Sequence, residues 1–403
     1  MTPNWNKTKL LGVMMTVNFL IYILVEVTRS YRQGGLYAGH PYMPSRHFWK
    51  KPKLSKAIWN RKQQHLDHIH NPLINSASSV RRFLPLPDLL RPSDRLKTTS
   101  CELDLNLSAQ MDGYASLPDR FKDFLLHMQC RSYPLLIDAA GVCSDPPFLL
   151  LVVKTLAPHF DRRQAIRQSW GRAGILDGRR VAVVFLLGRT SARDHLPDVS
   201  DLLRHEARLH ADLLQWDFRD AFFNLTLKEV LFLEWMGERC PLARYVFKGD
   251  DDVFVNTRSI LRFLGRLSGD KARDLFVGDV ISRAQPDRAV KSKYYVPESI
   301  FAGVYPPYAG GGGYLYSGDV ALRLRNVSRR VLLYPIDDVY TGICLQKLGL
   351  VPEKHKGFRT FNIDEKFKED ACTYKSLMLV HPRGPREVMQ IWSWINNPGL
   401  NCK

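Results

Sequence analysis

The sequence predicts an α/β fold built on a largely parallel sheet. Residues 148–153 and 181–187 are continuous aliphatic or β-branched runs bounded by Pro or Gly, a pattern typical of strands buried on both faces. The segment between them, 158–171, begins with Pro and ends with Gly, as a helix does. This strand, helix, strand succession indicates a βαβ unit. A chain of 403 residues with 45% hydrophobic content has room for a core domain of about 250–300 residues.

Two further segments extend this pattern toward a candidate site. Residues 117–126 have the spacing of an amphipathic helix and open the folded part of the chain. Residues 245–247 form a short apolar strand that runs directly into the acidic triplet 250–252. Open parallel sheets bind ligands beyond the carboxyl ends of their strands. We therefore expect the acidic triplet to lie at a functional edge of the sheet.

The N-terminal part predicts a membrane-anchored organisation. Residues 10–27 are almost wholly apolar and long enough for a thin bilayer. A cleaved signal peptide is the alternative, but no small-x-small cleavage site follows. We expect a cytosolic tail at 1–9, an anchor at 10–27, an extended lumenal stem at 28–115 and a catalytic domain at 116–403. Basic residues flank the anchor on both sides, so charge alone does not set its orientation.

The positive charge of the chain is concentrated in the predicted stem. The formal net charge is +18, and residues 29–99 alone hold fourteen Lys and Arg but only three Asp. This stretch contains Pro and His and has little apolar periodicity, which indicates a linker rather than a folded basic groove. We therefore expect no nucleic-acid partner.

Sequons and cysteines indicate an oxidising, lumenal environment for the residues after the anchor. The seven cysteines all follow residue 100 and lack the C-x-x-C spacing of a metal site, which favours disulfides. An odd count leaves at least one thiol outside an internal pair, and the pairing stays open. Three Asn-x-Ser/Thr sequons would carry glycans in such a compartment: Asn106, Asn224 and Asn326.

The acidic triplet Asp250-Asp251-Asp252 is a candidate metal site. Side chains alternate along an extended chain, so Asp250 and Asp252 can point the same way while Asp251 points elsewhere. A hard divalent cation would bridge one or two such carboxylates to substrate phosphates. This chemistry suggests transfer from a nucleotide sugar. The alternative is that the triplet only caps the helix predicted after residue 257.

The four glycines at 310–313 lie between aromatic residues and lead into a short aromatic strand. Without side chains, glycines let the backbone approach a sugar ring closely. We therefore interpret this stretch as a sugar contact, with a flexible surface loop as the alternative.

Two later segments supply candidate acid–base and metal groups. Asp337 and Asp338 precede a predicted helix, where one carboxylate could cap the helix and the other act as a general base. Near the end of the chain, the strand-like run 377–380 delivers His381 to a loop, where a neutral imidazole could complete a metal site. The alternative is that all three are structural residues.

Together these segments resemble the β-1,3-glycosyltransferase family, which includes β-1,3-galactosyltransferases, β-1,3-N-acetylglucosaminyltransferases and, more distantly, the fringe proteins. The resemblance covers about residues 115–403 and rests on an ordered set of motifs. These are RRQAIRQSW at 162–170, FLLG at 185–188, KGDDDVFVN at 248–256, YPPYAGGGG at 305–313 and DDVYTG at 337–342. The tail, the anchor, 117–126 and 351–360 look most similar to the N-acetylglucosaminyltransferases that extend poly-N-acetyllactosamine.

The resemblance implies a GT-A-type, Rossmann-like mixed sheet flanked by helices and a role for each matching residue. Asp252 and His381 would bind Mn²⁺ or Mg²⁺, and Asp338 would be the catalytic base. The other matching residues would contact the substrates: Arg163, Arg167, Lys248, Asp250, Asp251, Gly311, Gly312 and Asp337. Arg162 is an alternative to its neighbour as the phosphate contact. Much of the family carries Glu where this chain has Asp337, which leaves the role of that carboxylate open.

The implied reaction is inverting transfer of N-acetylglucosamine from UDP-GlcNAc to the 3-hydroxyl of a terminal β-galactose. Such an enzyme would be a type II protein of the Golgi membrane that acts on glycans of glycoproteins or glycolipids, and it could form homo-oligomers or hetero-oligomers with related glycosyltransferases. A β-1,3-galactosyltransferase that uses UDP-Gal is one alternative. The other is a catalytically silent glycan-binding or partner subunit, although such a protein would have no physical need to keep Asp250, Asp252, Asp338 and His381.

Overall fold

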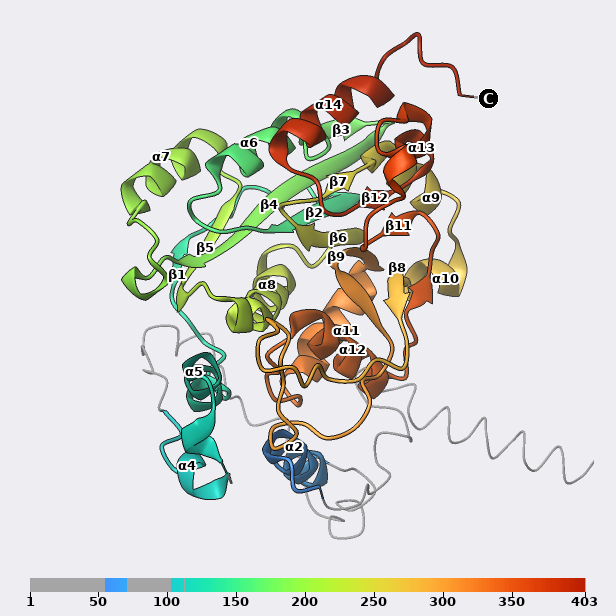
Figure 1. Ribbon diagram of the computed structural model, residues 1–403. Helices are drawn as coiled ribbons and strands as arrows, with labels where there is room; N and C mark the ends of the chain where they lie inside the picture. Colours follow the sequence, from blue (N-terminus) through green and yellow to red (C-terminus); the bar gives the residue numbers. More distant parts are fainter. Residues whose placement is uncertain (1–54, 71–102, 112, 403) are drawn as a thin grey trace, which may run out of the picture. The chain divides into compact units, whose positions relative to one another are not determined.

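A mixed sheet forms the centre of the protein, and helices cover both of its faces (Figure 1). The computed structural model describes residues 55–70, 103–111 and 113–402. Within them the nine strands of this sheet run in the order β1-β5-β4-β2-β6-β9-β8-β10, and β3 pairs with β4 at the side. Their bounds are β1 Leu135–Ile137, β2 Leu149–Lys154, β3 Gly174–Leu176, β4 Arg179–Arg189, β5 Leu213–Arg219, β6 Tyr245–Asp250, β8 Phe276–Ile281, β9 Tyr308–Ser317 and β10 Glu353–Lys354.

The parallel core that the apolar runs predict is confirmed. Strands β5, β4, β2 and β6 are parallel neighbours, and β9 then pairs antiparallel with β6. Every residue of β2 is buried. Leu150 and Val152 join the core cluster on one face, whereas Leu149, Leu151 and Val153 join the cluster on the other. This alternation explains why the strand is apolar along its whole length.

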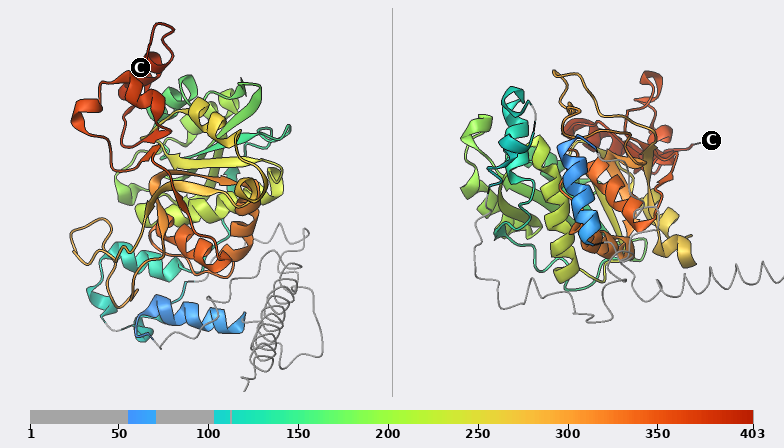
Figure 2. Two further views of the ribbon diagram at one scale, coloured as in Figure 1. Left: turned by 90° about the vertical axis from the view of Figure 1, so that its right-hand side faces the viewer. Right: turned by 90° about the horizontal axis from the view of Figure 1, so that it is seen from below.

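Two helical layers enclose the sheet. One face is covered by α8 (Leu225–Arg239), α11 (Gly318–Ser328) and α12 (Asp337–Leu348), and the other by α6 (Phe160–Gln168), α9 (Thr257–Leu264) and α14 (Pro385–Ile395) (Figures 1 and 2). The remaining α-helices in the described part of the chain are α2 Ile58–Ile69, α4 Leu107–Gln110, α5 Asp119–His127, α7 Ser200–His210, α10 Gly269–Arg273 and α13 Ala371–Ser376.

A second, three-stranded sheet brings the C-terminal part of the chain to the end of β6. Its strands are β11 (Phe358–Arg359), β12 (Leu379–Val380) and β7 (Phe254–Val255). β12 is antiparallel to β7, with Val380 opposite Phe254. The residue after Val380 therefore lies next to the loop that joins β6 to β7, although more than a hundred residues separate them in the chain.

The glycine-rich stretch, predicted to lead into a short aromatic strand, is itself part of that strand. All four glycines lie inside β9, which is ten residues long and paired on both sides, with β6 and β8. Glycine lowers strand propensity because it has no side chain to pack. Of the four glycines, Gly313 pairs with Gly249 of β6, whereas 310–312 lie where the register between β9 and β8 shifts.

The described part of the predicted stem is not extended. Residues 58–69 form the helix α2, in which Ile58, Trp59 and Gln63 are buried against the α/β body. Leu107 and Met111 are buried as well. The sequence pattern gave no sign of this docking because its partners lie more than 200 residues away. The predicted anchor at 10–27 lies outside the described residues, among which no helix is long and apolar enough to cross a bilayer.

Disulfides stabilise the body, as the cysteine pattern predicts. Cys143 pairs with Cys240, and Cys372 pairs with Cys402. Cys130 is also disulfide-bonded. Cys344, in α12, is buried and free.

The three sequons differ in their surroundings. Asn106 and Ser108 are both exposed. In the other two, the hydroxyl residue is buried: Thr226 donates to the carbonyl of Tyr334, and Ser328 donates to the carbonyl of Arg325. A glycan at Asn106 therefore fits the folded surface without any rearrangement.

Candidate active site

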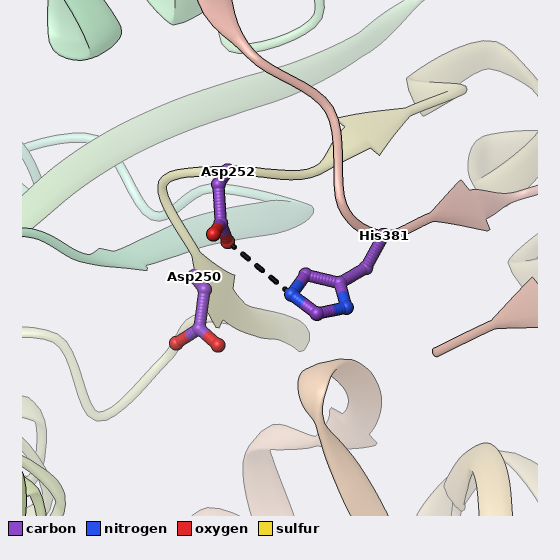
Figure 3. A group of neighbouring side chains, drawn as sticks. All are labelled: Asp250, Asp252 and His381. Atoms are coloured by element: carbon purple, nitrogen blue, oxygen red, sulfur yellow. Dashed lines mark ion pairs between the residues drawn. The ribbon is translucent and has the colours of Figure 1, made fainter. Parts of the chain in front are cut away.

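Three side chains from two distant parts of the chain meet beyond the end of β6 (Figure 3). Asp250 is the last residue of β6, Asp252 lies in the following loop, and His381 follows β12. One ligand atom from each lies within 4.8 Å of the others, and the His381 Nε2 is 3.6 Å from an Asp252 carboxylate oxygen. Two carboxylates and an imidazole form a donor set suited to a divalent cation.

The second nitrogen of His381 fixes the direction in which the ring binds. His381 Nδ1 lies 2.7 Å from the carbonyl oxygen of Thr360. A carbonyl only accepts hydrogen bonds, so Nδ1 donates its proton to it, and Nε2 is the nitrogen that faces Asp252. Orientation of a ligating imidazole through its other nitrogen is a common feature of metal sites. The residues present therefore fit a metal ion.

Backbone contacts hold the loop that carries Asp252. The carbonyl of Asp252 accepts a hydrogen bond of 2.7 Å from the backbone N–H of Arg383, just after His381. The indole of Trp170, at the end of α6, donates to the carbonyl of Val253 at 3.1 Å. These contacts keep the acidic loop and the histidine loop in a fixed relation.

Asp338 lies at the start of α12, beside β9. One of its carboxylate oxygens accepts a hydrogen bond of 3.1 Å from the backbone N–H of Gly311, and the other accepts 2.8 Å from the N–H of Val339. Burial and the neighbouring charge of Asp337 raise the pKa of Asp338 to about 7, against the opposing effect of Lys154. A carboxylate with this pKa can accept a proton near neutral pH.

A buried lysine connects the acidic cluster to the start of α12. Lys154 is the last residue of β2, and its Nζ lies 2.9 Å from a carboxylate oxygen of Asp250 and 2.7 Å from one of Asp337. Burial opposes the charge on Lys154, but the two carboxylates outweigh it and raise the pKa of the ammonium group. Burial likewise opposes ionisation of Asp337, and Lys154 and Lys248 outweigh it and lower the pKa of that carboxyl. Lys154 and Asp337 are therefore both charged.

The glycines of β9 leave room for these functional side chains. A Cβ atom on Gly312 would come within 3.1 Å of the His381 Cβ, and one on Gly311 would lie 3.5 Å from an Asp338 oxygen. The first distance is tighter than ordinary van der Waals contact and the second is not. The glycine backbone of β9 thus lies between Asp338 and His381.

Comparison with known proteins identifies the family of the chain. The galactosyltransferase family model matches residues 161–356. N-acetyllactosaminide β-1,3-N-acetylglucosaminyltransferase 2 is 52% identical in Mus musculus and 51% identical in Homo sapiens, over 100% of both chains in each comparison. UDP-GlcNAc:βGal β-1,3-N-acetylglucosaminyltransferase 7 of Mus musculus is 42% identical over 76% of this chain and 78% of its own. The chain belongs to the β-1,3-glycosyltransferase family.

A likeness to a solved structure, the apo form of the bifunctional glycosyltransferase WbbM, is weak. Its TM-score is 0.35 at 11% identity, over 63% of this chain and 50% of that chain. The family assignment depends on the sequence relatives alone.

In this transferase, three residues that were expected to contact substrate bind other groups of the protein instead. Arg163 is fully buried, donates to Glu206 and to the carbonyls of Leu156 and Ala157, and has no exposed surface for a phosphate. Arg167 binds Glu206 and Asp212. Asp251 accepts hydrogen bonds from Thr155 and Arg162 and contacts His159, so it fastens the acidic loop to α6.

Arg162 and Lys248 also differ from the expected picture. The Arg162 guanidinium is 30% exposed and lies 3.6 Å from Asp252, which makes it, rather than Arg163, the arginine beside the acidic cluster. Lys248 is fully buried, pairs with Glu229 and lies 3.9 Å from Asp337. It supports the site from within the core and does not reach its surface.

Lys154 was not among the residues predicted for the site. The signal was present, because a lysine ends an otherwise aliphatic buried strand at its carboxyl end, where ligands gather. Its importance depends on pairing between strands, since Lys154 is the direct neighbour of Asp250 in the parallel register of β2 and β6.

Proposed function

We propose that this transferase adds N-acetylglucosamine from UDP-GlcNAc, with inversion, to the 3-hydroxyl of a terminal β-galactose on N-acetyllactosamine-type glycans. The relatives named above, 51–52% identical over the whole chain, carry that activity in their names. The observation that carries the proposal is the charged network Asp250–Lys154–Asp337, which connects a candidate cation site to the base Asp338. The products would be β-1,3-GlcNAc linkages of poly-N-acetyllactosamine.

Asp250, Asp252 and His381 would hold Mn²⁺ or Mg²⁺ in this enzyme. When bound, the cation would offset the negative charge that develops on the diphosphate as the sugar leaves. Arg162 adds a positive guanidinium beside Asp252, where an anionic donor would be attracted. These residues bind and orient the donor.

Asp338 would take the proton from the attacking hydroxyl of the acceptor. Its hydrogen bonds to Gly311 and Val339 hold the carboxylate in one orientation. Its pKa near 7 makes it a base of suitable strength at neutral pH. Attack on the face of the sugar opposite the leaving diphosphate would convert the α-linked donor into a β-linked product.

We also propose a GT-A-type fold and a Golgi location for the enzyme. The mixed sheet with an acidic loop after a parallel strand supports the fold assignment. The disulfides and the exposed sequon at Asn106 support a lumenal position of the body. An anchor at 10–27 would then place residues 1–9 in the cytosol, as in a type II membrane protein.

The decisive experiment is transfer to an N-acetyllactosamine acceptor. The enzyme is incubated separately with UDP-GlcNAc and with UDP-Gal, each with Mn²⁺, with Mg²⁺ and with a chelator, and the product linkage is determined. We expect a β-1,3-linked GlcNAc product that requires the cation. A galactose product would favour the β-1,3-galactosyltransferase alternative, and an absence of any product would favour the silent-subunit alternative.

A further inference from the structure

The helix α2, which precedes the catalytic body in the sequence, is hydrogen-bonded to the segment that leads to Asp338. The indole N–H of Trp59 donates to the carbonyl of Leu333 at 2.9 Å. The amide of Gln63 donates to the carbonyl of Arg330 at 2.9 Å and accepts from the backbone N–H of Leu332 at 2.7 Å. The bonded carbonyls and N–H lie only five to eight residues before Asp338.

The same helix also contacts α12 near its far end. The carboxylate of Asp67 lies 2.9 Å from Lys347 Nζ, and both residues are largely buried. The segment before α12 is therefore held to α2 by hydrogen bonds, and the last turn of α12 is held to α2 by an ion pair. Figure 2 shows α2, in blue, beside the orange helical layer. A shift of α2 would be transmitted to the helix that carries Asp338.

A second set of hydrogen bonds connects α2 to the segment that leads into β9. The backbone N–H groups of Ile58 and Trp59 donate to the carbonyls of Ser299 and Ile300 at 2.8 and 3.0 Å. The side chain of Asn60 binds Ala302 twice, since it donates to the carbonyl at 3.1 Å and accepts from the N–H at 3.0 Å. Residues 299–302 lie six to nine positions before the start of β9.

Aromatic packing joins these two sets of bonds. The ring of Trp59 lies 5.5 Å from the rings of both Phe301 and Tyr334, and the hydroxyls of Tyr305 and Tyr334 are 2.8 Å apart. Tyr305 in turn packs against Tyr308 at 6.2 Å. This series of rings runs from α2 to the first residue of β9.

The series ends on the face of α12 that carries the base. A Cβ atom on Gly342 would come within 2.7 Å of the Tyr308 Cβ, so the backbone of α12 and Tyr308 are in close contact. Gly342 is four residues after Asp338 and therefore lies on the same face of the helix. The metal-site residues, by contrast, come from β6 and from the segment after β12.

We propose that α2 is a positioning element for the acceptor side of the active site, with Gln63 and Asn60 as its principal positioning residues. Gln63 fixes the approach to α12, and Asn60 fixes the approach to β9, so together they set the distance between Asp338 and Gly311. This role rests on the proposed function, because it assigns Asp338 to the acceptor hydroxyl. Asp252, His381 and Arg162 lie on other elements, and α12 reaches the cation site only through Asp337 and Lys154, so donor and cation binding should depend on α2 far less than the acceptor side does.

The test uses the full chain with the substitutions Gln63→Ala and Asn60→Ala. Because small displacements of a catalytic group are costly, we expect kcat/KM for the N-acetyllactosamine acceptor to fall about tenfold in each variant. Mn²⁺-dependent affinity for UDP, measured by calorimetry, should stay within about twofold, as for sites that do not interact. His65→Ala, on the exposed face of the same helix, is the matched control and should leave both quantities unchanged.

The outcomes separate positioning from general destabilisation. Thermal melting of each variant gives its folded fraction at the assay temperature. A fall in UDP affinity and acceptor kcat/KM in the same proportion as the folded fraction would overturn the positioning role, as would acceptor kinetics equal to those of the unchanged protein. Failure of the unchanged protein to transfer any sugar would instead overturn the proposed function, and with it this inference.

Discussion

Asp337 and Asp338 are adjacent in the sequence, yet their surroundings push their pKa values apart. Lys154 and Lys248 outweigh burial around Asp337 and lower its pKa, whereas burial and Asp337 itself raise the pKa of Asp338 to about 7. When the pKa values of two neighbouring carboxyl groups differ in this way, the two groups can have different functions. Asp337 stays ionised and holds the lysines, while Asp338 is able to exchange a proton at neutral pH.

The substitution Asp338→Asn tests the role of the base. The amide oxygen can still accept the hydrogen bond from Gly311 but cannot take up a proton, so we expect kcat to fall by about 10²- to 10⁴-fold. Affinity for UDP-GlcNAc should change little, because the donor is bound by other residues. Steady-state kinetics and calorimetry measure the two quantities. A variant with a near-normal rate would remove Asp338 from this role.

The pH dependence of the reaction follows from the raised pKa of Asp338. The base must be ionised to act, so the rate should fall as the pH drops through about 7. Asp337→Asn removes the negative charge that raises this pKa, and the pKa of Asp338 should then be lower. We therefore expect the acid limb of the kcat profile to move to lower pH in this variant, whatever its maximum rate. An unmoved limb would show that another group titrates.

Residue roles are the part of the site that sequence reasoning predicts least well. Asp252, His381 and Asp338 could be proposed because each follows or precedes a recognisable strand or helix. Arg163 stands in a motif just as distinctive, but Glu206, 43 positions later, neutralises its guanidinium inside the core. Whether an arginine faces a substrate or a buried partner depends on such distant residues, which a local pattern does not reveal.

At the scale of elements, β9 combines two functions in one strand. Gly313 pairs with Gly249 of β6, and the missing side chains of Gly311 and Gly312 leave space for Asp338 and His381. A flexible loop would not hold two functional groups at a fixed separation. The backbone of β9 between these two groups is therefore part of the active site.

A matched pair of substitutions tests this function of β9. The Cβ of Gly312→Ala would lie 3.1 Å from the His381 Cβ and displace the imidazole, so we expect Mn²⁺ affinity to fall about five- to tenfold. The Cβ of Gly311→Ala would be 3.5 Å from Asp338, an ordinary contact, and Mn²⁺ affinity should be nearly unchanged. Titration of the metal by calorimetry compares the two variants. Equal losses in both would indicate general strain in the strand instead.

The elements themselves were predictable where hydrophobic patterns are local. The apolar runs gave β2 and β4, and Pro and Gly bounded the helix α6 between them. β9 was predicted only in its aromatic second half, because four glycines carry no hydrophobic alternation. α2 was missed because its burial depends on residues 299–302 and 330–333, which the surrounding charged sequence does not indicate.

At the scale of the whole molecule, long-range covalent and non-covalent links hold the layers together. Cys143, before β2, is joined to Cys240, at the end of α8, across 97 residues. Cys372 and Cys402 join α13 to the C-terminal segment across 30 residues. The first disulfide thus closes a loop that contains much of the parallel sheet, whereas the second closes a peripheral one.

The difference in loop length predicts different contributions to stability. Loss of a native disulfide costs about 2–5 kcal/mol, and the loop-entropy model makes the 97-residue link about 1 kcal/mol more stabilising than the 30-residue link. We therefore expect the double variant Cys143→Ser with Cys240→Ser to lower the free energy of unfolding more than Cys372→Ser with Cys402→Ser. Urea unfolding of the two variants measures this. An equal or larger loss in the second variant would mean that loop length does not set the difference between the two links.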